Sequence, residues 1–465
     1  MKHRALWTVL ALAALTVVAV AQVPTFEPPK VTIPTTNNGV GARAMGMGGA
    51  FTAVADDGTA ATWNPAGLSQ LKRPQVTLVY NFINDDRTTR INGDYRSGAN
   101  TTTYDAHETG HYDINALQFV SGTYPFLWKD RQCAVQVSYN RILQQPDGNV
   151  GRVFTFHMPS GVDEIQNRRI TMAPKGGIDL WTGTFSIELV KKLHLGFSLN
   201  YLKAKYSYRS AIYEEVGTTD GTYASMYMDH VDDYFSFTGF TADLGLLWKP
   251  NDKFSAGFVY HTKFNRSIRE QYTRGPGSFR ATTGADYHWQ ITNDWHGRVT
   301  WPQSAGFGVA YRPTQNLLLA SDYMWTQWRE GKIVYDVPAA FGTYAFPNVW
   351  VRRQHDVHTV RLGGEYTFIM KNGWVVPVRA GYFRSNNPSN YFDSEGTNYQ
   401  QTAINGFTVG GGITINYVQA DIAYVRTMGQ DRKSDVGQST AASFYEIGES
   451  DYKGNQLIIS LIVRF

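Results

Sequence analysis

The fold of this chain follows from one segment, Gly39–Leu68, which reads GVGARAMGMGGAFTAVADDGTAATWNPAGL. The segment is rich in glycine and alanine and has few branched apolar side chains. Glycine permits backbone conformations with positive φ and lets two backbones approach closely. Asn64 followed by Pro65 is typical of a helix N-cap with proline at the first helical position, and Asp56-Asp57 can cap another short helix. Because side chains this small cannot build their own core, we expect the segment to fold inside the rest of the chain.

A secretory leader precedes this segment. The only long apolar run of the chain is Ala5–Val20, which follows the basic residues Lys2 and Arg4 and ends at an A-x-A site around Ala21. A basic start, an apolar centre and a small-residue cleavage site together predict a signal peptide at residues 1–21.

The overall composition excludes several classes of protein. A mean hydropathy of −0.33 is too polar for a bundle of transmembrane helices. Loss of Lys2 and Arg4 with the leader lowers the formal net charge from +4 to +2, so we expect no nucleic-acid partner. The single cysteine, Cys133, excludes an intramolecular disulfide and is expected to be a buried, inert thiol. Residues 22–38 hold four prolines and little apolar pattern, which predicts an extended lead-in.

The rest of the chain repeats a two-residue alternation of apolar and polar side chains. The last segment shows the alternation most clearly, with Leu457, Ile459 and Leu461 on one face and Ser460 on the other. This period is typical of strands that have one apolar and one polar face.

The expected connections between these strands alternate between short and long. The short turns carry polar or turn-forming residues and lie at residues 128–131, 249–253, 312–316 and 370–373. Long loops are expected near residues 84–112, 142–177, 207–233, 266–299, 330–356, 385–403 and 428–453. Short turns at one end and long loops at the other are typical of a bacterial outer-membrane barrel.

We therefore predict an all-β fold, in which residues 74–465 form a transmembrane antiparallel β-barrel of about 14 strands with long extracellular loops. An even number of strands leaves both ends of the barrel in the periplasm. Closure is required because open sheet edges are not tolerated in hydrocarbon. The alternative, a soluble secreted propeller or sandwich, would show sequence repeats or regular strand spacing, which this chain lacks.

The glycine-rich segment also resembles a known family. From Gly41 it reads GARAMGMGGAFTAVADDGTAATWNPAGLSQL, which is similar to the N-terminal hatch of the FadL-type outer-membrane transporters, and the Asn-Pro-Ala hallmark of that family stands here as Asn64-Pro65-Ala66. Trp301–Glu330 resembles the proline-containing strand, short turn and Trp-rich returning strand of the same family. The resemblance implies that residues 22–73 are an N-terminal extension and hatch that plugs the lumen. It further implies passive, hatch-gated uptake of hydrophobic small molecules such as long-chain fatty acids or aromatic hydrocarbons.

The same resemblance implies that substrate leaves sideways, through a gap made by a kink in the third strand. The third predicted strand, about Arg131–Leu143, contains no glycine or proline, and Pro146 lies just beyond it. The expected partners are a hydrophobic ligand, outer-membrane lipid and lipopolysaccharide, and the barrel-assembly machinery, whose signal a terminal Phe465 resembles. A monomer is expected.

An alternative function comes from a second similarity. The start of the glycine-rich segment is also similar to the PorV-like barrels of a protein secretion system, which would make this chain a barrel that binds or shuttles a secreted protein.

Two sets of residues are candidates for function. The hatch anchor is predicted at Asn64, Pro65 and Ala66, with Asp56, Asp57 and Trp63 around it. Aromatic and methionine side chains in the expected loops can cover an apolar ligand, and these are Tyr213, Tyr223, Met226, Tyr227, Met228, Phe341, Tyr344 and Phe346. The alternative for such residues is the aromatic girdle that barrels carry at the membrane interface.

Patterns that suggest enzyme chemistry have simpler explanations. His107–His111 satisfies the HExxH zinc pattern, but it contains a glycine and runs into a predicted strand, so no helix is available to carry it. Gly39–Ala44 matches the dinucleotide pattern G-x-G-x-x-A, but no strand precedes it. The chain has no G-x-S-x-G elbow, Walker loop or zinc-type cysteine spacing. We therefore expect neither an enzyme nor a metal or cofactor site.

Overall fold

The computed structural model describes residues 39–97, 100–144, 147–157, 161–173, 175–221, 224–280, 286–335, 355–386, 402–438 and 442–465. The predicted signal peptide and lead-in, together with Tyr223, Phe341, Tyr344 and Phe346, lie outside these ranges. Within them, no helix is both long and apolar enough to cross a membrane.

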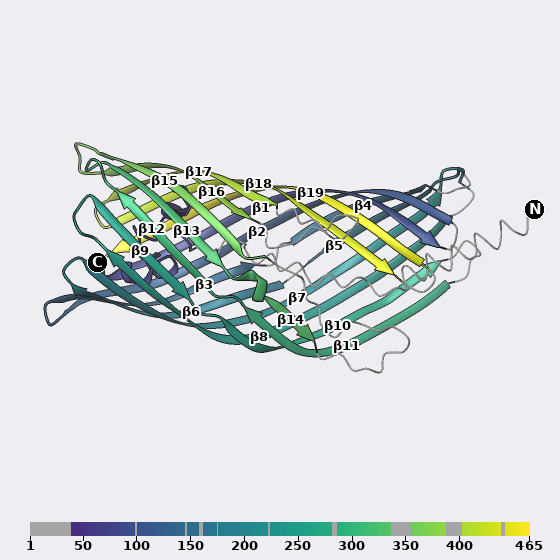
Figure 1. The fold of residues 1–465 in the computed structure, drawn as a ribbon, viewed down its shortest axis with the longest axis horizontal. Helices are drawn as coiled ribbons and strands as arrows, with labels where there is room; N and C mark the ends of the chain where they lie inside the picture. The colour runs from purple at the N-terminus through teal and green to yellow at the C-terminus, as the bar shows by residue number, and fades with distance from the viewer. Residues whose placement is uncertain are drawn as a thin grey trace, which may run out of the picture. The chain divides into compact units, whose positions relative to one another are not determined.

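Strands dominate the described residues (Figure 1). They are β1 (Gln75–Ser97), β2 (Asn100–Trp128), β3 (Arg131–Gln144), β4 (Asp147–His157), β5 (Glu164–Met172), β6 (Lys175–Val190), β7 (Leu193–Thr218), β8 (Ala224–Trp248), β9 (Phe254–His261), β10 (Phe264–Arg280), β11 (Asp286–Trp301), β12 (Ser304–Tyr311), β13 (Leu317–Thr326), β14 (Lys332–Tyr335), β15 (Val357–Ile369), β16 (Val375–Asn386), β17 (Ala403–Ile415), β18 (Val418–Gln438) and β19 (Ala442–Arg464).

These segments form one closed antiparallel barrel of 14 strands, as predicted. The strands neighbour one another in the order β1, β2, β3, β6, β7, β8, β9, β12, β13, β15, β16, β17, β18 and β19. The barrel closes because β19 pairs with β1 from Gln75 opposite Arg464 to Ser97 opposite Ala442. At the short-turn end, each of these strands is paired on both sides within the described residues.

Some strands are interrupted partway and continue as a second segment toward the long-connection end. The chain breaks between β11 and β12 at Pro302, which has no N–H to donate to the ladder. Between β13 and β14 the break is the short 3₁₀-helix η3 (Trp328–Glu330). Beyond the breaks, β4 and β5 lie between β2 and β7, and β10 and β11 continue the wall beside β8.

The prediction of loops at residues 84–112 and 207–233 is wrong, and strands also fill most of the described residues in the predicted loops 142–177, 266–299 and 428–453. β1 and β2 remain paired through the first range up to Ser97 opposite Asn100, and β7 and β8 through the second up to Gly217 opposite Ala224. The physical reason is that strands beyond the membrane need no apolar outer face, so the backbone ladder continues while the apolar alternation stops. The long connections are therefore largely strand extensions of the barrel.

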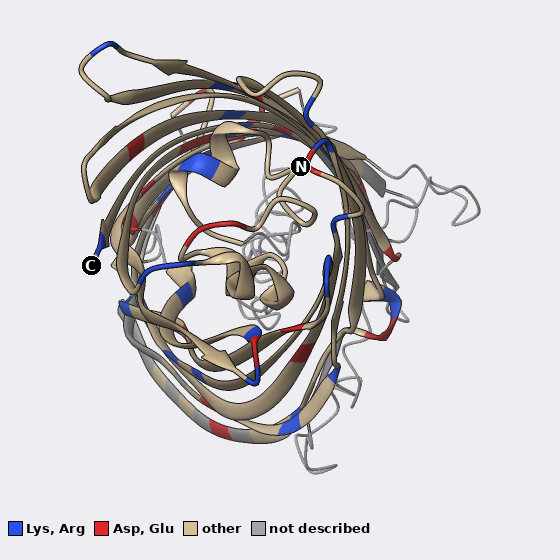
Figure 2. Cartoon of the chain, turned by 90° about the vertical axis from the view of Figure 1, so that its left-hand side faces the viewer, with Lys and Arg blue, Asp and Glu red and all other residues tan. Residues whose placement is uncertain are grey.

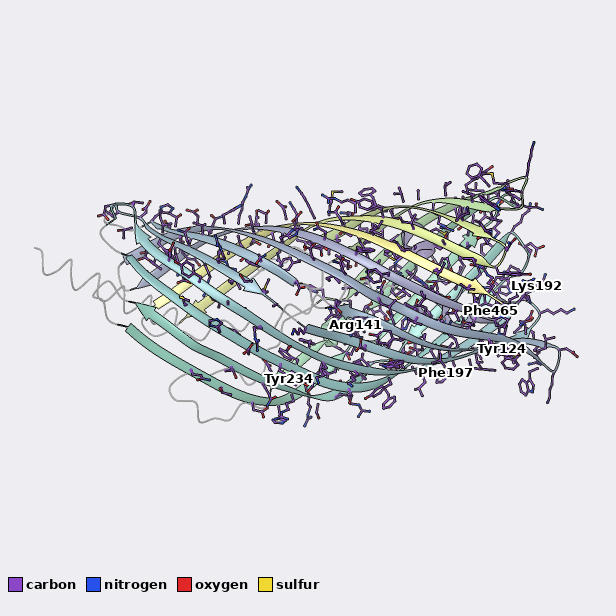
Figure 3. All side chains as sticks on the ribbon, turned by 180° about the vertical axis from the view of Figure 1, so that it is seen from behind. Tyr124, Arg141, Lys192, Phe197, Tyr234 and Phe465 are labelled. Carbon is purple, nitrogen blue, oxygen red and sulfur yellow. The ribbon has the colours of Figure 1, made fainter. Side chains whose placement is uncertain are left out.

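The outer face of the barrel carries an apolar band. Outward side chains such as Val137, Phe197 and Leu199 are largely exposed, although they would be buried in a soluble fold. Aromatic side chains border the band at the short-turn end, where Figure 3 shows Tyr124 and Phe465. At its other border, Tyr139 and Trp181 pack with ring centroids 5.0 Å apart. An apolar band between aromatic girdles identifies the barrel as transmembrane.

Residues 39–73, which we call the hatch segment, lie inside the barrel at the short-turn end (Figure 2). The segment holds the short helix α2 (Ala42–Gly46) and the 3₁₀-helices η1 (Ala60–Thr62) and η2 (Pro65–Gln70). Its apolar side chains form one core with inward residues of the wall, including Val79, Phe119 and Ile458. As expected, the segment has no core of its own.

Glycines on the inner wall let the hatch backbone lie directly against the strand backbone. A Cβ atom at Gly245 would lie 2.2 Å from Asn64 Oδ1, and one at Gly257 would lie 2.3 Å from the carbonyl oxygen of Thr52. On another part of the wall, a Cβ at Gly381 would lie 2.1 Å from the amide nitrogen of Gly48. These distances are far below van der Waals contact, so the hatch fits only against a wall that has no side chains there.

We expect Gly381→Ala to displace the hatch and to lower the free energy of unfolding by about 1–3 kcal/mol, because the added methyl group overpacks the site. Heat-modifiable migration on gels and a urea unfolding curve in detergent would measure the loss. The control is Gly364→Ala on the outer face of the neighbouring strand, where the nearest atom to the new Cβ is 3.5 Å away. Equal stability of the two variants would contradict this packing.

Candidate functional site

Asn64 is the residue through which the hatch segment is fastened to itself and to the wall. Its side-chain oxygen accepts a hydrogen bond from the amide of Ala66 at 3.1 Å, which caps η2 as predicted, with Pro65 at the first position of that helix. Its side-chain nitrogen donates to the carbonyl oxygens of Thr52 in the hatch and of Leu246 in β8, both at 2.9 Å. The side chain is fully buried. Water cannot reach it, so these bonds are what satisfies its polar atoms.

Trp63 holds the start of the hatch segment. Its indole nitrogen donates to the carbonyl oxygen of Val40 at 2.9 Å, and its ring lies edge-on to Phe51 at 6.0 Å. The guanidinium group of Arg361, a fully buried residue of β15, lies 5.8 Å from the Trp63 ring centroid. The predicted anchor residue Trp63 therefore contacts both the hatch and the wall.

A charged network joins the hatch to the wall through Arg43. The Arg43 guanidinium contacts Asp56 at 2.5 Å and binds both carboxylate oxygens of Glu365 in β15, at 2.9 and 3.0 Å. Arg379 of β16 donates to the same carboxylate and to Asp421 of β18, both at 2.7 Å. Burial alone would lower the pKa of Arg43, but its attraction to Asp56 and Glu365 raises that pKa well above its ordinary value. Arg43 therefore stays charged and holds α2 against this part of the wall.

The two predicted aspartates have separate roles. Asp56 pairs with Arg43, whereas the carboxylate of Asp57 accepts the amide and the hydroxyl of Thr59, at 2.8 and 2.6 Å, just before η1. Burial raises the pKa of Asp57, and the nearby Arg43 and the bonds from Thr59 oppose that rise.

Asp322 of β13 fastens the centre of the hatch. One of its carboxylate oxygens accepts the backbone amides of Phe51 and Thr52 at 2.9 and 2.8 Å. Among the described residues, the other oxygen, Oδ1, accepts no hydrogen bond although it is buried. A buried carboxylate with one oxygen unsatisfied is costly, whereas the oxygen and the nitrogen of the Asn64 side chain are both bonded.

Inward aromatic side chains form a cluster on the side of the hatch that faces the long-connection end. Even-numbered residues of β7 and odd-numbered residues of β8 face the lumen, because Gly196 and Gly245 on those faces touch the hatch. The stacked pair Tyr206 and Phe235, with ring centroids 5.0 Å apart, therefore also faces the lumen. The cluster continues across β10, β11 and η3 through ring contacts of 5.9 to 6.5 Å, and we call the following set the lumen cluster: Tyr206, Phe235, Phe237, Phe264, Trp301 and Trp328.

One cation stands beside the lumen cluster. Gly239 leaves space on the inner face of β8, and both the Phe264 ring and the Arg266 side chain reach into it, 3.0 and 3.5 Å from where a Cβ would be. Arg266 is exposed to the lumen, and its guanidinium has no ion-pair or hydrogen-bond partner among the described residues. Two other inward arginines are paired, Arg152 with Glu108 and Arg168 with Glu214.

The sequence analysis did not identify the lumen cluster. Phe264 and Trp301 lie at the edges of a predicted loop and Arg266 within it, so none was assigned to an inner strand face. The two-residue period could have assigned these residues to the lumen face. It needed one reference residue on that face, such as Gly245, which packs against the hatch.

Of the predicted loop residues, the structure describes the side chains of Tyr213 and Met228. They lie opposite each other on β7 and β8, both exposed on the outer face. Met226 and Tyr227 belong to the same strand extension in β8. None of the four lies in a loop, and the two described side chains do not reach the lumen. A role for this set in ligand capture remains a prediction.

The barrel wall is interrupted between β2 and β3. Pairing of β2 with β3 ends at Phe119 opposite Asn140, and pairing with β4 begins at Asp113 opposite Asp147. Within the described ranges, Ile114–Gln118 of β2 therefore has no partner strand on that side.

Bulges and apolar side chains flank this interruption. The register of β3 with β6 shifts between Arg141 and Leu143, and inside the wall Leu143 lies opposite the buried Ile178. On the outer face, Arg141 pairs with Asp179 at 2.8 Å, near the middle of the barrel wall in Figure 3. The irregularity falls near the end of the third strand, the strand in which the resemblance implies a kink.

The HExxH pattern does not form a zinc site. His107 and His111 face outward on β2, whereas Glu108 faces inward and forms an ion pair with Arg152. Alternation along a strand puts the glutamate on the opposite side of the wall from both histidines.

The described features define a transmembrane β-barrel with its N-terminal segment inside the lumen and an apolar cluster above that segment. No protein-family model and no curated protein matches the chain. Among solved structures, it is similar to a FadL homologue of Pseudomonas aeruginosa, with a TM-score of 0.58, 15% identity and coverage of 92% of this chain and 98% of that one. It is also similar to the toluene transporter TodX of Pseudomonas putida, with a TM-score of 0.54, 15% identity and coverage of 92% and 99%. The chain thus has the fold of the FadL-type outer-membrane transporters.

We expect Asn64→Ala to lower the free energy of unfolding by about 2–4 kcal/mol, because it removes a cap and leaves two buried carbonyl groups unpaired. Unfolding in urea would measure the change. A matched control is Asn251→Ala, since Asn251 caps an exposed turn by accepting the amides of Lys253 and Phe254. A loss for Asn64→Ala no larger than that of the control would show that Asn64 only caps a turn.

Proposed function

We propose that this protein is an outer-membrane channel for passive, hatch-gated uptake of hydrophobic small molecules that carry one anionic group, such as long-chain fatty acids. The observation that carries the proposal is the lumen cluster with the unpaired Arg266 beside it. Binding sites for small apolar ligands are lined by aromatic side chains with a few polar groups that fix orientation. A carboxylate next to Arg266 would form a charge-assisted hydrogen bond.

A second aromatic group supports a path from the extracellular end. Tyr104 packs on Phe154 and Phe156 of β4, with ring centroids 6.3 and 5.4 Å away, on the inner face of the strand extensions. The buried Ile91 and Ala106 lie against these rings. We infer that an apolar ligand first meets this group and then the lumen cluster.

We place the gate at Asp322 because it is the hatch contact nearest to the lumen cluster along one strand. The inward face of β13 carries Asp322, then Met324, and the chain then reaches Trp328 of the cluster in η3. A ligand that moves Trp328 would therefore act on β13, the strand whose Asp322 holds the amides of Phe51 and Thr52. The unsatisfied oxygen of Asp322 makes this contact the easier one to release, while Asn64 keeps the hatch attached.

For the exit, we propose the interruption between β2 and β3. It lies at the level where the outward apolar band ends, and the side chains that flank it from inside, Phe119 and Ile178, are apolar and buried. A sideways exit at this height leads into the outer leaflet. None of the described contacts favours the alternative of a barrel that shuttles a secreted protein.

Uptake of labelled oleate and of toluene, by cells whose only transporter of this type is this protein, tests the proposal. Arg266→Gln should reduce oleate uptake about tenfold, the effect of losing one charge-assisted hydrogen bond, and should leave toluene uptake unchanged. Phe264→Ala should reduce the uptake of both compounds.

The matched control is Phe258→Ala, which removes a phenyl ring from the lipid-facing side of β9 and should leave uptake unchanged. No protein-dependent uptake of either compound by an assembled barrel would refute the proposed function. Equal loss of oleate and toluene uptake in Arg266→Gln would refute the role of Arg266 in recognising the carboxylate.

A further inference from the structure

Positive charge is concentrated at the short-turn end of the barrel, which faces the viewer in Figure 2. The connections at this end, from the hatch to β1 and between neighbouring strands, hold nine cations and two acids, a net charge of +7. The whole chain carries +4, so its other residues are together net negative. We call the following residues the mouth cations: Lys72, Arg73, Lys129, Lys191, Lys192, Lys249, Lys253, Arg312 and Lys371.

Acidic groups of the protein itself neutralise little of this charge. Among the described residues, Arg312 is the one mouth cation in an ion pair, and its guanidinium lies 3.7 Å from Asp56 of the hatch. Asp56 contacts Arg43 more closely, at 2.5 Å. Like charges gathered on one face repel one another and attract an oppositely charged partner, over about 8 Å at physiological salt.

Five of the mouth cations lie along one arc of the rim. The amide of Lys249 donates to the carbonyl oxygen of Lys192, and the amide of Arg312 donates to that of Lys253, both at 2.7 Å. These bonds hold the β6–β7, β8–β9 and β12–β13 connections side by side. Figure 3 shows Lys192 at this end of the barrel.

A small polar cavity lies beside this arc, between the wall and the hatch. Lys249, Lys253 and Arg312 line it from the wall, and Asp56 and Gln70 line it from the hatch. Its volume is about 100 Å³, which is room for a side-chain carboxylate. The Lys249 ammonium donates to Gln70 at 2.8 Å, so this cation is turned toward the hatch.

The position of these cations indicates what kind of partner they suit. Lipid headgroups surround the outside of the barrel, whereas the cations of the cavity face the hatch inside it. A single small anion can occupy the cavity, but it cannot cover connections that are spread around the mouth. The face of a soluble protein can do both, because a specific interface buries about 800 Å² on each partner.

We propose that the short-turn end is a docking surface for a soluble periplasmic protein that has an acidic face. A glutamate or aspartate of the partner enters the cavity beside Lys253 and Arg312, and further carboxylates lie against the remaining mouth cations. Charge complementarity of this kind steers association and makes binding sensitive to salt. The docked partner contacts the hatch at Asp56 and Gln70, which line the same cavity.

Photo-crosslinking in intact cells tests the proposal, with p-benzoylphenylalanine in place of Gln315, an exposed residue of the β12–β13 connection. We expect a product heavier than the chain by the mass of a protein. Lys253→Gln combined with Arg312→Gln should reduce the yield of this product about tenfold, because complementary charge governs association. Lys253→Arg combined with Arg312→Lys keeps the charge and should keep the parent yield.

The matched control is Lys203→Gln combined with Lys205→Gln, which removes the same charge from exposed positions of β7 and should leave the yield unchanged. Equal losses in the two neutralised variants, or no protein-sized product from the parent chain, would overturn the proposal. If the variant at Lys253 and Arg312 does not assemble as a heat-modifiable barrel, Lys253→Gln alone decides between the same outcomes.

Binding of a decaglutamate peptide to the purified protein in nanodiscs separates a protein partner from lipid. In phosphatidylcholine nanodiscs, Lys253→Gln combined with Arg312→Gln should weaken peptide binding about tenfold. The ratio of the parent and variant affinities should stay the same when phosphatidylglycerol is added. Its disappearance would assign the cations to lipid headgroups and refute the proposal. Neither measurement uses ligand uptake, so both are independent of the proposed transport function.

Discussion

The rest of the structure depends on the direct contact between the hatch backbone and a barrel backbone that has no side chains at the contact. Asn64 lies against Gly245, Thr52 against Gly257 and Gly48 against Gly381. Each contact is too close to leave room for a Cβ atom on the wall glycine. This approach brings backbone carbonyls such as that of Leu246 within reach of the hatch. It also fixes where the hatch lies along the barrel wall relative to the lumen cluster.

The contacts of the hatch differ in strength along its length, and this difference gives the proposed gate its physical basis. Asn64 and Arg43 are held by several satisfied bonds each. Asp322 holds Phe51 and Thr52 through one carboxylate oxygen and leaves the other without a partner. Buried polar groups that are fully satisfied rigidify a structure, whereas a buried polar atom left without a partner is costly. In the proposed gate, the hatch rearranges at its centre while its two ends stay attached.

The barrel, its 14 strands and the cap at Asn64 could be predicted from the sequence, because period-2 alternation and the Asn-Pro pair are local signals. The strand extensions could not, since residues such as those around Thr88 and Arg209 are polar on both faces and resemble loops. The lumen cluster was missed for a related reason. Phe264 and Trp301 meet only through strand pairing, and an alternating pattern with apolar residues on both faces does not state which face is the lumen.

Hydrogen–deuterium exchange of the purified protein, with and without saturating oleate, tests the central claim most directly. Without ligand, we predict that the amides of Phe51, Thr52, Ala66 and Ser69 are all protected, because each is hydrogen-bonded to a buried side chain. With oleate, exchange should accelerate at Phe51 and Thr52, while Ala66 and Ser69 stay protected. Rapid exchange at all four positions without ligand, or no change at Phe51 and Thr52 in a protein that takes up oleate, would contradict the account.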